Sequence, residues 1–170
     1  MEHREALRAL LREWLCGAKR LAVLGAGSVL KADDGAGVAL VEHLQEAFSV
    51  AKHPGLLLCP GETAPENFSG KIKAFEPTHL LVVDAADLGK QPGHITEINP
   101  QDIGGPTFCS HMLPLRVMID YLAAETGASI LLLGIQPESI VFDAPMSVAA
   151  EDAVAWLCEV LEEMVRELCL

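Results

Sequence analysis

The stretch "RLAVLGAGSVLKADDGAGVALVEHLQEAF", residues 20–48, contains a strand, a glycine-rich turn and a helix in succession. The run "LAVL" is apolar throughout and leads directly into Gly25 and Gly27, which is typical of a buried parallel strand that ends in a tight turn. After the turn, apolar residues recur at helical spacing and predict the buried stripe of a helix: Val38, Val41, Leu44 and Phe48. A strand, a turn and a helix in this order form the repeating unit of α/β proteins.

The rest of the chain repeats this alternation. Apolar strands are predicted at residues 55–61, 78–87 and 129–137, and a more polar strand at 93–100 is expected at an antiparallel edge. Further helices are predicted at residues 3–16, 64–75, 110–127 and 147–169. We therefore predict an α/β fold with three layers, in which a mostly parallel twisted sheet of about five strands lies between helices, with an extra N-terminal helix. The 170 residues suit a single domain over residues 1–170.

The composition narrows the class of protein. The net charge is −12, which argues against nucleic-acid binding and against an anionic membrane surface, because both need clustered Lys and Arg. No apolar run is long enough to span a bilayer, and the charged N-terminus is unlike a signal peptide, so we expect a cytoplasmic protein. The five cysteines are widely spaced without a CxxC pair, so we expect reduced, mostly structural thiols.

Acidic residues follow several of the predicted strands. Asp33 and Asp34 lie after the first strand, Asp84 ends the third, and His111 precedes a helix that should begin at the same edge. Other polar residues at the strand ends are Glu62, Glu66, Asn67, Asp87, Gln136 and Glu138, and the only basic one is Lys31. Sites in open α/β sheets form outside the carboxyl ends of the strands. Such an edge would repel phosphate, whereas carboxylates and an imidazole are a common ligand set for a divalent transition metal.

Each of these residues also has a purely structural interpretation. One of Asp33 and Asp34 could cap the following helix, Asp84 could form a turn, and His111 could bond a carbonyl. Leu30 stands where a dinucleotide-binding fingerprint needs its third glycine, which disfavours a dinucleotide-binding protein. No GxSxG nucleophile elbow is present, which disfavours a serine hydrolase of the α/β-hydrolase type. A nucleophilic Cys109 has an awkward spacing to His111. The remaining histidines are expected at the surface: His3, His43, His53, His79 and His94.

Five motifs in order across most of the chain resemble one family. They are "LGAGSVLKADDGAGV", "GETAPEN", "LLVVDAAD", "SHMLPL" and "LLLGIQPES". Each is weak alone, but the ordered set resembles the maturation endopeptidases of [NiFe]-hydrogenases, most of all the branch that processes the large subunit of the formate-hydrogenlyase hydrogenase (hydrogenase 3). Two departures are Ser28, where the family usually has Asn, and Glu62, where it often has a small residue.

The resemblance implies an endopeptidase that makes one cut in the nickel-loaded precursor of a hydrogenase large subunit and removes its C-terminal extension. The family's metal-contacting positions fall on Asp34, Asp84 and His111, which we also expect to be the catalytic residues. The Ni²⁺ is expected to come with the precursor, and the protein is expected to act as a monomer. The nickel could polarise the scissile carbonyl or activate water, or a carboxylate could be the general base.

A protein of another class would use the same three residues. A metal-binding maturation or chaperone module without peptidase activity needs the same ligands but cuts nothing. A flavodoxin-like nucleotide binder would share the fold, but the acidic edge disfavours it. Cleavage of a precursor is therefore the property that separates these hypotheses.

Overall fold

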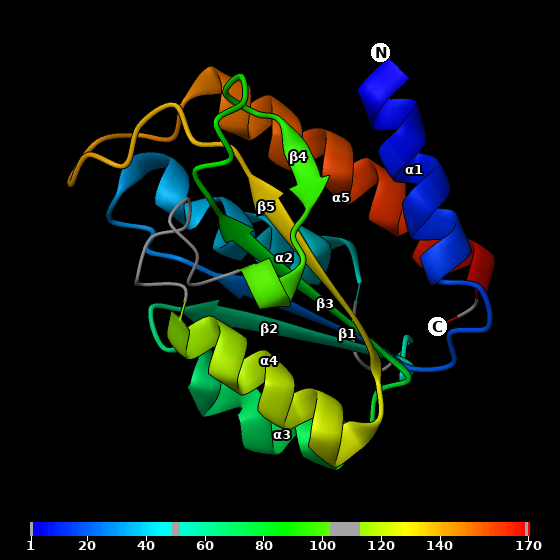
Figure 1. Cartoon of the computed structure of the whole chain (residues 1–170). Coiled ribbons are helices and arrows are strands. Elements are labelled where there is room, and N and C mark those ends of the chain that lie inside the picture. The colour runs from blue at the N-terminus through cyan, green and yellow to red at the C-terminus, as the bar shows by residue number, and fades with distance from the viewer. Residues whose placement is uncertain (1, 49–51, 103–112, 169) are drawn as a thin grey trace.

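A five-stranded sheet lies between two layers of helices in the computed structural model, which describes residues 2–48, 52–102, 113–168 and 170 (Figure 1). The strands are β1 (Leu21–Ala26), β2 (Leu56–Glu62), β3 (His79–Ala85), β4 (Ile95–Glu97) and β5 (Ser129–Ile135). Their order is β2-β1-β3-β5-β4, with β4 antiparallel to β5 and all other pairs parallel. The predicted α/β fold and its antiparallel edge strand are confirmed.

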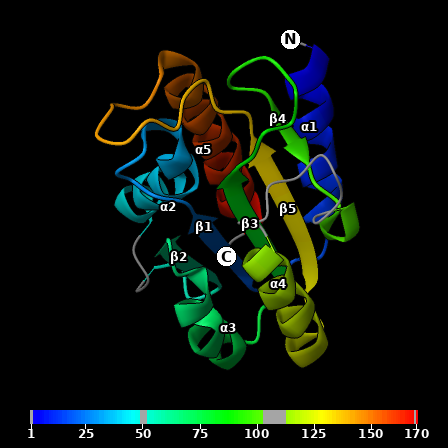
Figure 2. The ribbon, with the colours of Figure 1, turned by 60° about the vertical axis from the view of Figure 1, so that its left-hand side comes forward.

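Helices cover both faces of the sheet (Figure 2). One layer holds α1 (Glu2–Trp14), α2 (Ala36–Ala47) and α5 (Val148–Leu168), and the other holds α3 (Ser69–Phe75) and α4 (Leu113–Thr126). Short 3-10 turns lie at η1 (Ala32–Gly35), η2 (Pro65–Phe68) and η3 (Pro100–Asp102). The helix predicted at 64–75 is thus a 3-10 turn followed by an α-helix, with Pro65 at the start of the turn. No helix in the described ranges is both long and apolar enough to cross a bilayer.

The central strands are buried on both faces, which explains their unbroken apolar sequences. In β3, Leu81 and Val83 pack against the layer of α1, α2 and α5, while Leu80 and Val82 pack against α3 and α4. These four side chains are completely buried. Side chains alternate between the faces of a strand, so one continuous apolar run supplies both cores.

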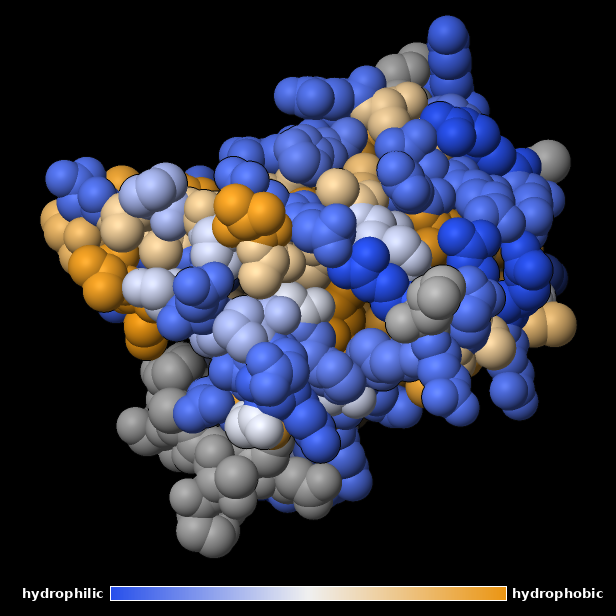
Figure 3. Space-filling view, turned by 90° about the horizontal axis from the view of Figure 1, so that it is seen from above, coloured by the Kyte–Doolittle hydropathy of each residue, from blue (hydrophilic) through white to orange (hydrophobic). Residues whose placement is uncertain are grey.

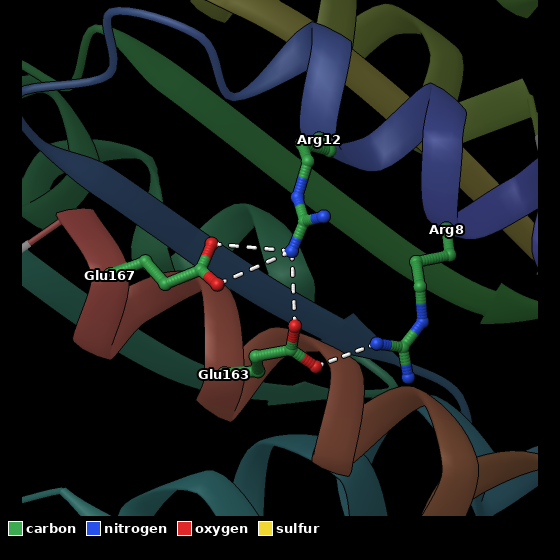
Figure 4. Close-up of polar contacts among 4 residues, drawn as sticks. All are labelled: Arg8, Arg12, Glu163 and Glu167. Carbon is green, nitrogen blue, oxygen red and sulfur yellow. Dashed lines mark hydrogen bonds and ion pairs between the residues drawn. The ribbon is translucent and has the colours of Figure 1, made fainter.

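The extra N-terminal helix α1 packs on α5 and the sheet. Its Leu7 and Leu11 are buried in the larger core, as the helical spacing predicts. On the exposed side, the Arg8 guanidinium lies 2.6 Å from Glu163, and that of Arg12 bonds to both Glu163 and Glu167 (Figure 4). The helix therefore covers one side of the core with its apolar face and makes ion pairs along its outer edge.

Candidate active site

The glycine-rich turn after β1 folds back over the end of its own strand. Gly27 has φ +116°, and a Cβ there would lie 1.8 Å from the carbonyl oxygen of Asp34. A Cβ on Gly25 would lie 2.0 Å from the carbonyl oxygen of Gly37, at the start of α2. Only glycine permits these approaches. The glycines thus bring the first turn of α2, with Asp34 just before it, onto the carboxyl end of β1.

A pocket of about 400 Å³ opens at the carboxyl ends of β1, β2 and β3. Its acidic lining residues are Asp34, Glu62, Glu66 and Asp84, and its one basic lining residue in the described ranges is Lys31. The pocket lies where the sheet order reverses, with β2 on one side of β1 and β3 on the other. This is the position at which ligand sites form in open α/β sheets. The convergence predicted for Asp34 and Asp84 is therefore present.

Asp84 is a buried carboxylate without a cation partner in the described part of the chain. Its side chain follows the apolar run of β3 into the pocket, and the residue is only 7% exposed. Burial raises the pKa of Asp84 to about 7, and the negative charge of nearby Asp34 adds to the rise. The turn-former interpretation does not account for such a group, since a turn residue is normally solvated.

Asp34 is half-buried and is held by the turn before it. One carboxylate oxygen accepts a hydrogen bond of 2.9 Å from the backbone N–H of Ser28. This bond uses the main chain, so the family's usual Asn is not needed for it. The carboxylate is fixed at the pocket wall by one oxygen, which leaves the second oxygen for a ligand.

Asp33 has a different role from its neighbour. It is completely buried, and its carboxylate accepts hydrogen bonds from the backbone N–H groups of Glu138, Ser139 and Ser147 and from the Ser147 hydroxyl. Although burial opposes ionisation, these bonds lower the pKa of Asp33 below its ordinary value. Neither aspartate caps α2, whose N-cap Gly35 has no side-chain bond, so the capping interpretation is wrong. Asp33 instead ties the turn after β1 to the segment between β5 and α5.

The comparisons with known proteins agree with this site and fold. The family profile described as hydrogenase maturation protease matches residues 38–164. The chain belongs to this family. It is 37% identical over 141 residues to the hydrogenase 3 maturation protease of Escherichia coli, covering 82% of this chain and 87% of that protein. It is 30% identical over 142 residues to the hydrogenase expression/formation protein HoxM of Cupriavidus necator, covering 77% of this chain and 68% of that protein.

A solved structure of the same family superimposes closely. The crystal structure of a [NiFe] hydrogenase maturation protease from Thermococcus kodakarensis has a TM-score of 0.85 and 30% sequence identity. The superposition covers 92% of this chain and 99% of the Thermococcus chain. The architecture of this maturation protease is thus one that the family also shows in a solved structure, as the resemblance in sequence predicted.

His111, the third residue predicted for the site, lies outside the described residues. Helix α4 begins two positions later, and its Pro114 and Leu115 line the pocket. Within the described ranges, no group of three His, Cys, Asp or Glu side chains could hold a metal ion. Within the described residues, the pocket therefore offers two carboxylates, those of Asp34 and Asp84, of the chemical type that binds divalent cations.

Several other strand-end residues are structural. The Gln136 side chain accepts hydrogen bonds from the backbone N–H groups of Leu88 and Lys90, so it holds the segment after β3. Asn67 and Asp87 are exposed and do not line the pocket. Glu62 does line it and adopts φ +50°, a left-handed conformation that a non-glycine residue rarely takes.

Histidines predicted at the surface are in part buried. His43 is exposed, but His3, His53, His79 and His94 are half-buried, which corrects the prediction. The rings of His3 and His94 stack at 3.8 Å, and the ring of His79 meets Trp14 edge-on. His3, His79 and His94 therefore lie where α1 meets the sheet, whereas His53 packs edge-on against Phe48. Helical or strand periodicity does not reveal such junctions.

The described cysteines are not placed for catalysis. Cys59 and Cys158 are buried, and burial raises the pKa of their thiols to about 11 and about 12. Cys16 is exposed and does not line the pocket. Cys109 lies outside the described residues. The structural role predicted for most of the thiols holds for the two buried ones.

Proposed function

We propose that this maturation protease removes the C-terminal extension from the nickel-loaded precursor of a [NiFe]-hydrogenase large subunit. Asp34, Asp84 and His111 would contact the precursor's own nickel. The name of the Escherichia coli relative supports a substrate of the hydrogenase 3 type. The solved Thermococcus relative supports the [NiFe] class of hydrogenase. The cut would be made in the cytoplasm by a monomer of the protease.

One observation carries this proposal: Asp34 and Asp84 share a pocket, and neither makes an ion pair with Lys31 or any other basic residue in the described ranges. Asp84 is almost fully buried, and Asp34 lies close enough to raise its pKa. Two carboxylates held this way are costly when both are ionised, because like charges repel and burial removes water. A divalent cation that arrives with the substrate would offset that cost. The site would then be complete only when a metal-bearing precursor is docked.

The chemistry open to the site is peptide-bond hydrolysis. Nickel held against the pocket would polarise a nearby carbonyl, which favours attack by water. Without a cation, the pKa of Asp84 near 7 would also suit a general base at neutral pH. A bound cation would lower that pKa, so Asp84 cannot easily serve as ligand and base in the same step. We assign it the ligand role and expect metal-assisted hydrolysis.

The test is to incubate the protein with a nickel-loaded and a nickel-free large-subunit precursor and to measure intact masses. We expect the loaded precursor to lose its C-terminal peptide in one step and the nickel-free one to remain uncut. Efficient cleavage of a rigorously nickel-free precursor would refute the nickel requirement while leaving the peptidase activity in place. A complex with the loaded precursor that never yields a shortened product would instead favour a metal-binding module without peptidase activity.

A further inference from the structure

Five exposed apolar residues lie on loops that also contribute Lys31 and Ile140 to the pocket lining. They come from two loops, one after β1 and one between β5 and α5, and we call them the apolar rim: Val29, Leu30, Ile140, Val141 and Phe142. Each is between 54% and 67% exposed. In Figure 3, hydrophobic residues gather at the left-hand end of the face, where Figure 1 shows the segment between β5 and α5 projecting from the molecule. Large exposed apolar groups in one place usually mark an interaction surface.

The two loops of the rim are joined to each other. The backbone N–H of Asp143 donates to the carbonyl oxygen of Leu30 at 2.9 Å, and that of Asp33 donates to Ser139 at 3.1 Å. Ile140 belongs both to the rim and to the pocket lining. The apolar rim is therefore one surface, and it is continuous with the pocket.

The projecting loop is fixed at its base. The carboxylate of Asp33 bonds Glu138 and Ser139 at the beginning of the loop and Ser147 at its end. Ser147 in turn accepts a hydrogen bond from Ala150 in the first turn of α5. A buried ion with four hydrogen bonds thus holds both ends, while the tip carries the exposed apolar residues. A loop ordered before binding loses less entropy when it docks.

We propose that the apolar rim docks into an apolar recess on the folded body of the large-subunit precursor, next to the point where its C-terminal extension leaves that body. This inference rests on the proposed function, whose scissile bond must reach the adjoining pocket. The segment between β5 and α5 projects from the molecule (Figure 1), and a projection suits a hollow in a folded partner better than an extended peptide, which needs a groove to lie in. The side chains of the rim are uncharged, so the net charge of −12 contributes no specific pairing there.

The test compares Val141→Ser/Phe142→Ser with Val117→Ser, a control on α4 whose valine is equally exposed at 67%. Steady-state processing of nickel-loaded precursor should show KM raised about tenfold or more by the double change, with kcat retained, because two buried anchors are lost. The control should match the parent protein. Circular dichroism and thermal unfolding should be unchanged for both, since surface side chains carry little of the stability.

Binding measurements identify the occupant. Precursor truncated before its extension should still bind the parent protein and should bind the double variant about tenfold more weakly or worse. An unchanged affinity and KM in the double variant would overturn the proposal. Weakening seen only with an isolated extension peptide would assign the rim to the extension and also overturn it. A parent dimer in sedimentation equilibrium that the double change abolishes would assign it to a second copy.

The two proposals fail in different ways. A parent protein that binds precursor through the rim but never cuts it would leave the docking proposal standing and remove the peptidase function. If the parent protein and the double variant cut precursor with the same KM, the peptidase function would stand and the docking proposal would be overturned. A parent protein that binds no precursor at all would overturn both.

Discussion

Carboxylates are concentrated in two regions of this protein, and the two regions differ in whether the carboxylates are exposed and ion-paired. Along α1 and α5, Glu163 and Glu167 face Arg8 and Arg12, and their side chains are 40% and 55% exposed (Figure 4). At the pocket, Asp84 is only 7% exposed and makes no ion pair within the described residues, and the negative charge of Asp34 adds to the rise of its pKa. The first arrangement is paired and solvated, whereas the second is unpaired and buried.

The difference separates charges that are placed for the fold from charges that are placed for a ligand. Exposed ion pairs cost little to form and contribute little to stability. A buried carboxylate with a like-charged neighbour lowers the stability of the free protein, and such perturbed groups concentrate at functional sites. In a chain of net charge −12, the number of acidic residues is therefore less informative than whether each has a partner.

The largest expected effect comes from removing the three residues proposed for the site. Asp34→Ala, Asp84→Ala and His111→Ala should each lower the rate of precursor processing by about 10²–10³-fold or more, since each removes a group that acts at the reacting centre. The rate is measured from the intact mass of nickel-loaded precursor over time. Arg12→Ala, which breaks the paired region instead, is the control and should process precursor at the parent rate. Parent-like processing by all three variants would show that these residues do not form the site.

A second effect tests the buried aspartate that does have partners. Asp33→Ala should lower the free energy of unfolding by about 3 kcal/mol, because it leaves the N–H groups of Glu138, Ser139 and Ser147 without their acceptor. Urea unfolding followed by circular dichroism measures the change. The pKa of Asp33 is lowered by folding, so its contribution is present above its ordinary pKa of 3.8 and is lost as the pH falls below it. A loss below about 1 kcal/mol would mean that Asp33 does not fix the loop.

The sequence predicted what is local and periodic. The strand ending at Asp84 and the turn before Asp34 follow from apolar runs and glycines, and parallel strands place their ends at one edge, so this pair could be predicted. The hydrogen bonds that the Asp33 carboxylate accepts join residues more than a hundred positions apart, and no local pattern encodes them.

The apolar rim was missed for a different reason. The run Ile140–Phe142 is visible in the sequence, but three apolar residues between turns do not show whether they will be buried.

A third effect has the opposite sign from the others. Asp84→Asn should raise the free energy of unfolding of metal-free protein by roughly 2 kcal/mol at about pH 8, while it abolishes processing. The pKa of Asp84 is about 7 in the folded protein and ordinarily 3.8, so the folded state keeps the proton between these values. The stability that Asp84 contributes is therefore full below about pH 4 and is lost as the pH rises through about 7. Urea unfolding in the presence of a chelator should show the higher free energy of unfolding of Asp84→Asn at about pH 8 but not at about pH 4. An equal increase in the free energy of unfolding at low pH would mean that packing, and not the charge of Asp84, causes it.

The smallest effect belongs to the paired region. A double-mutant cycle with Arg12→Ala and Glu163→Ala should give a coupling energy of about 0.5 kcal/mol or less, falling further in high salt, because both side chains are largely solvated. Leu11→Ala, on the same helix but completely buried, should cost about 3 kcal/mol in the same unfolding assay. The helix would then be held by its apolar face, with the ion pairs of Figure 4 as a minor addition. A coupling energy above about 2 kcal/mol would show that a surface salt bridge changes the free energy of unfolding as much as the buried Asp84 does. The contrast between the two regions would then be wrong.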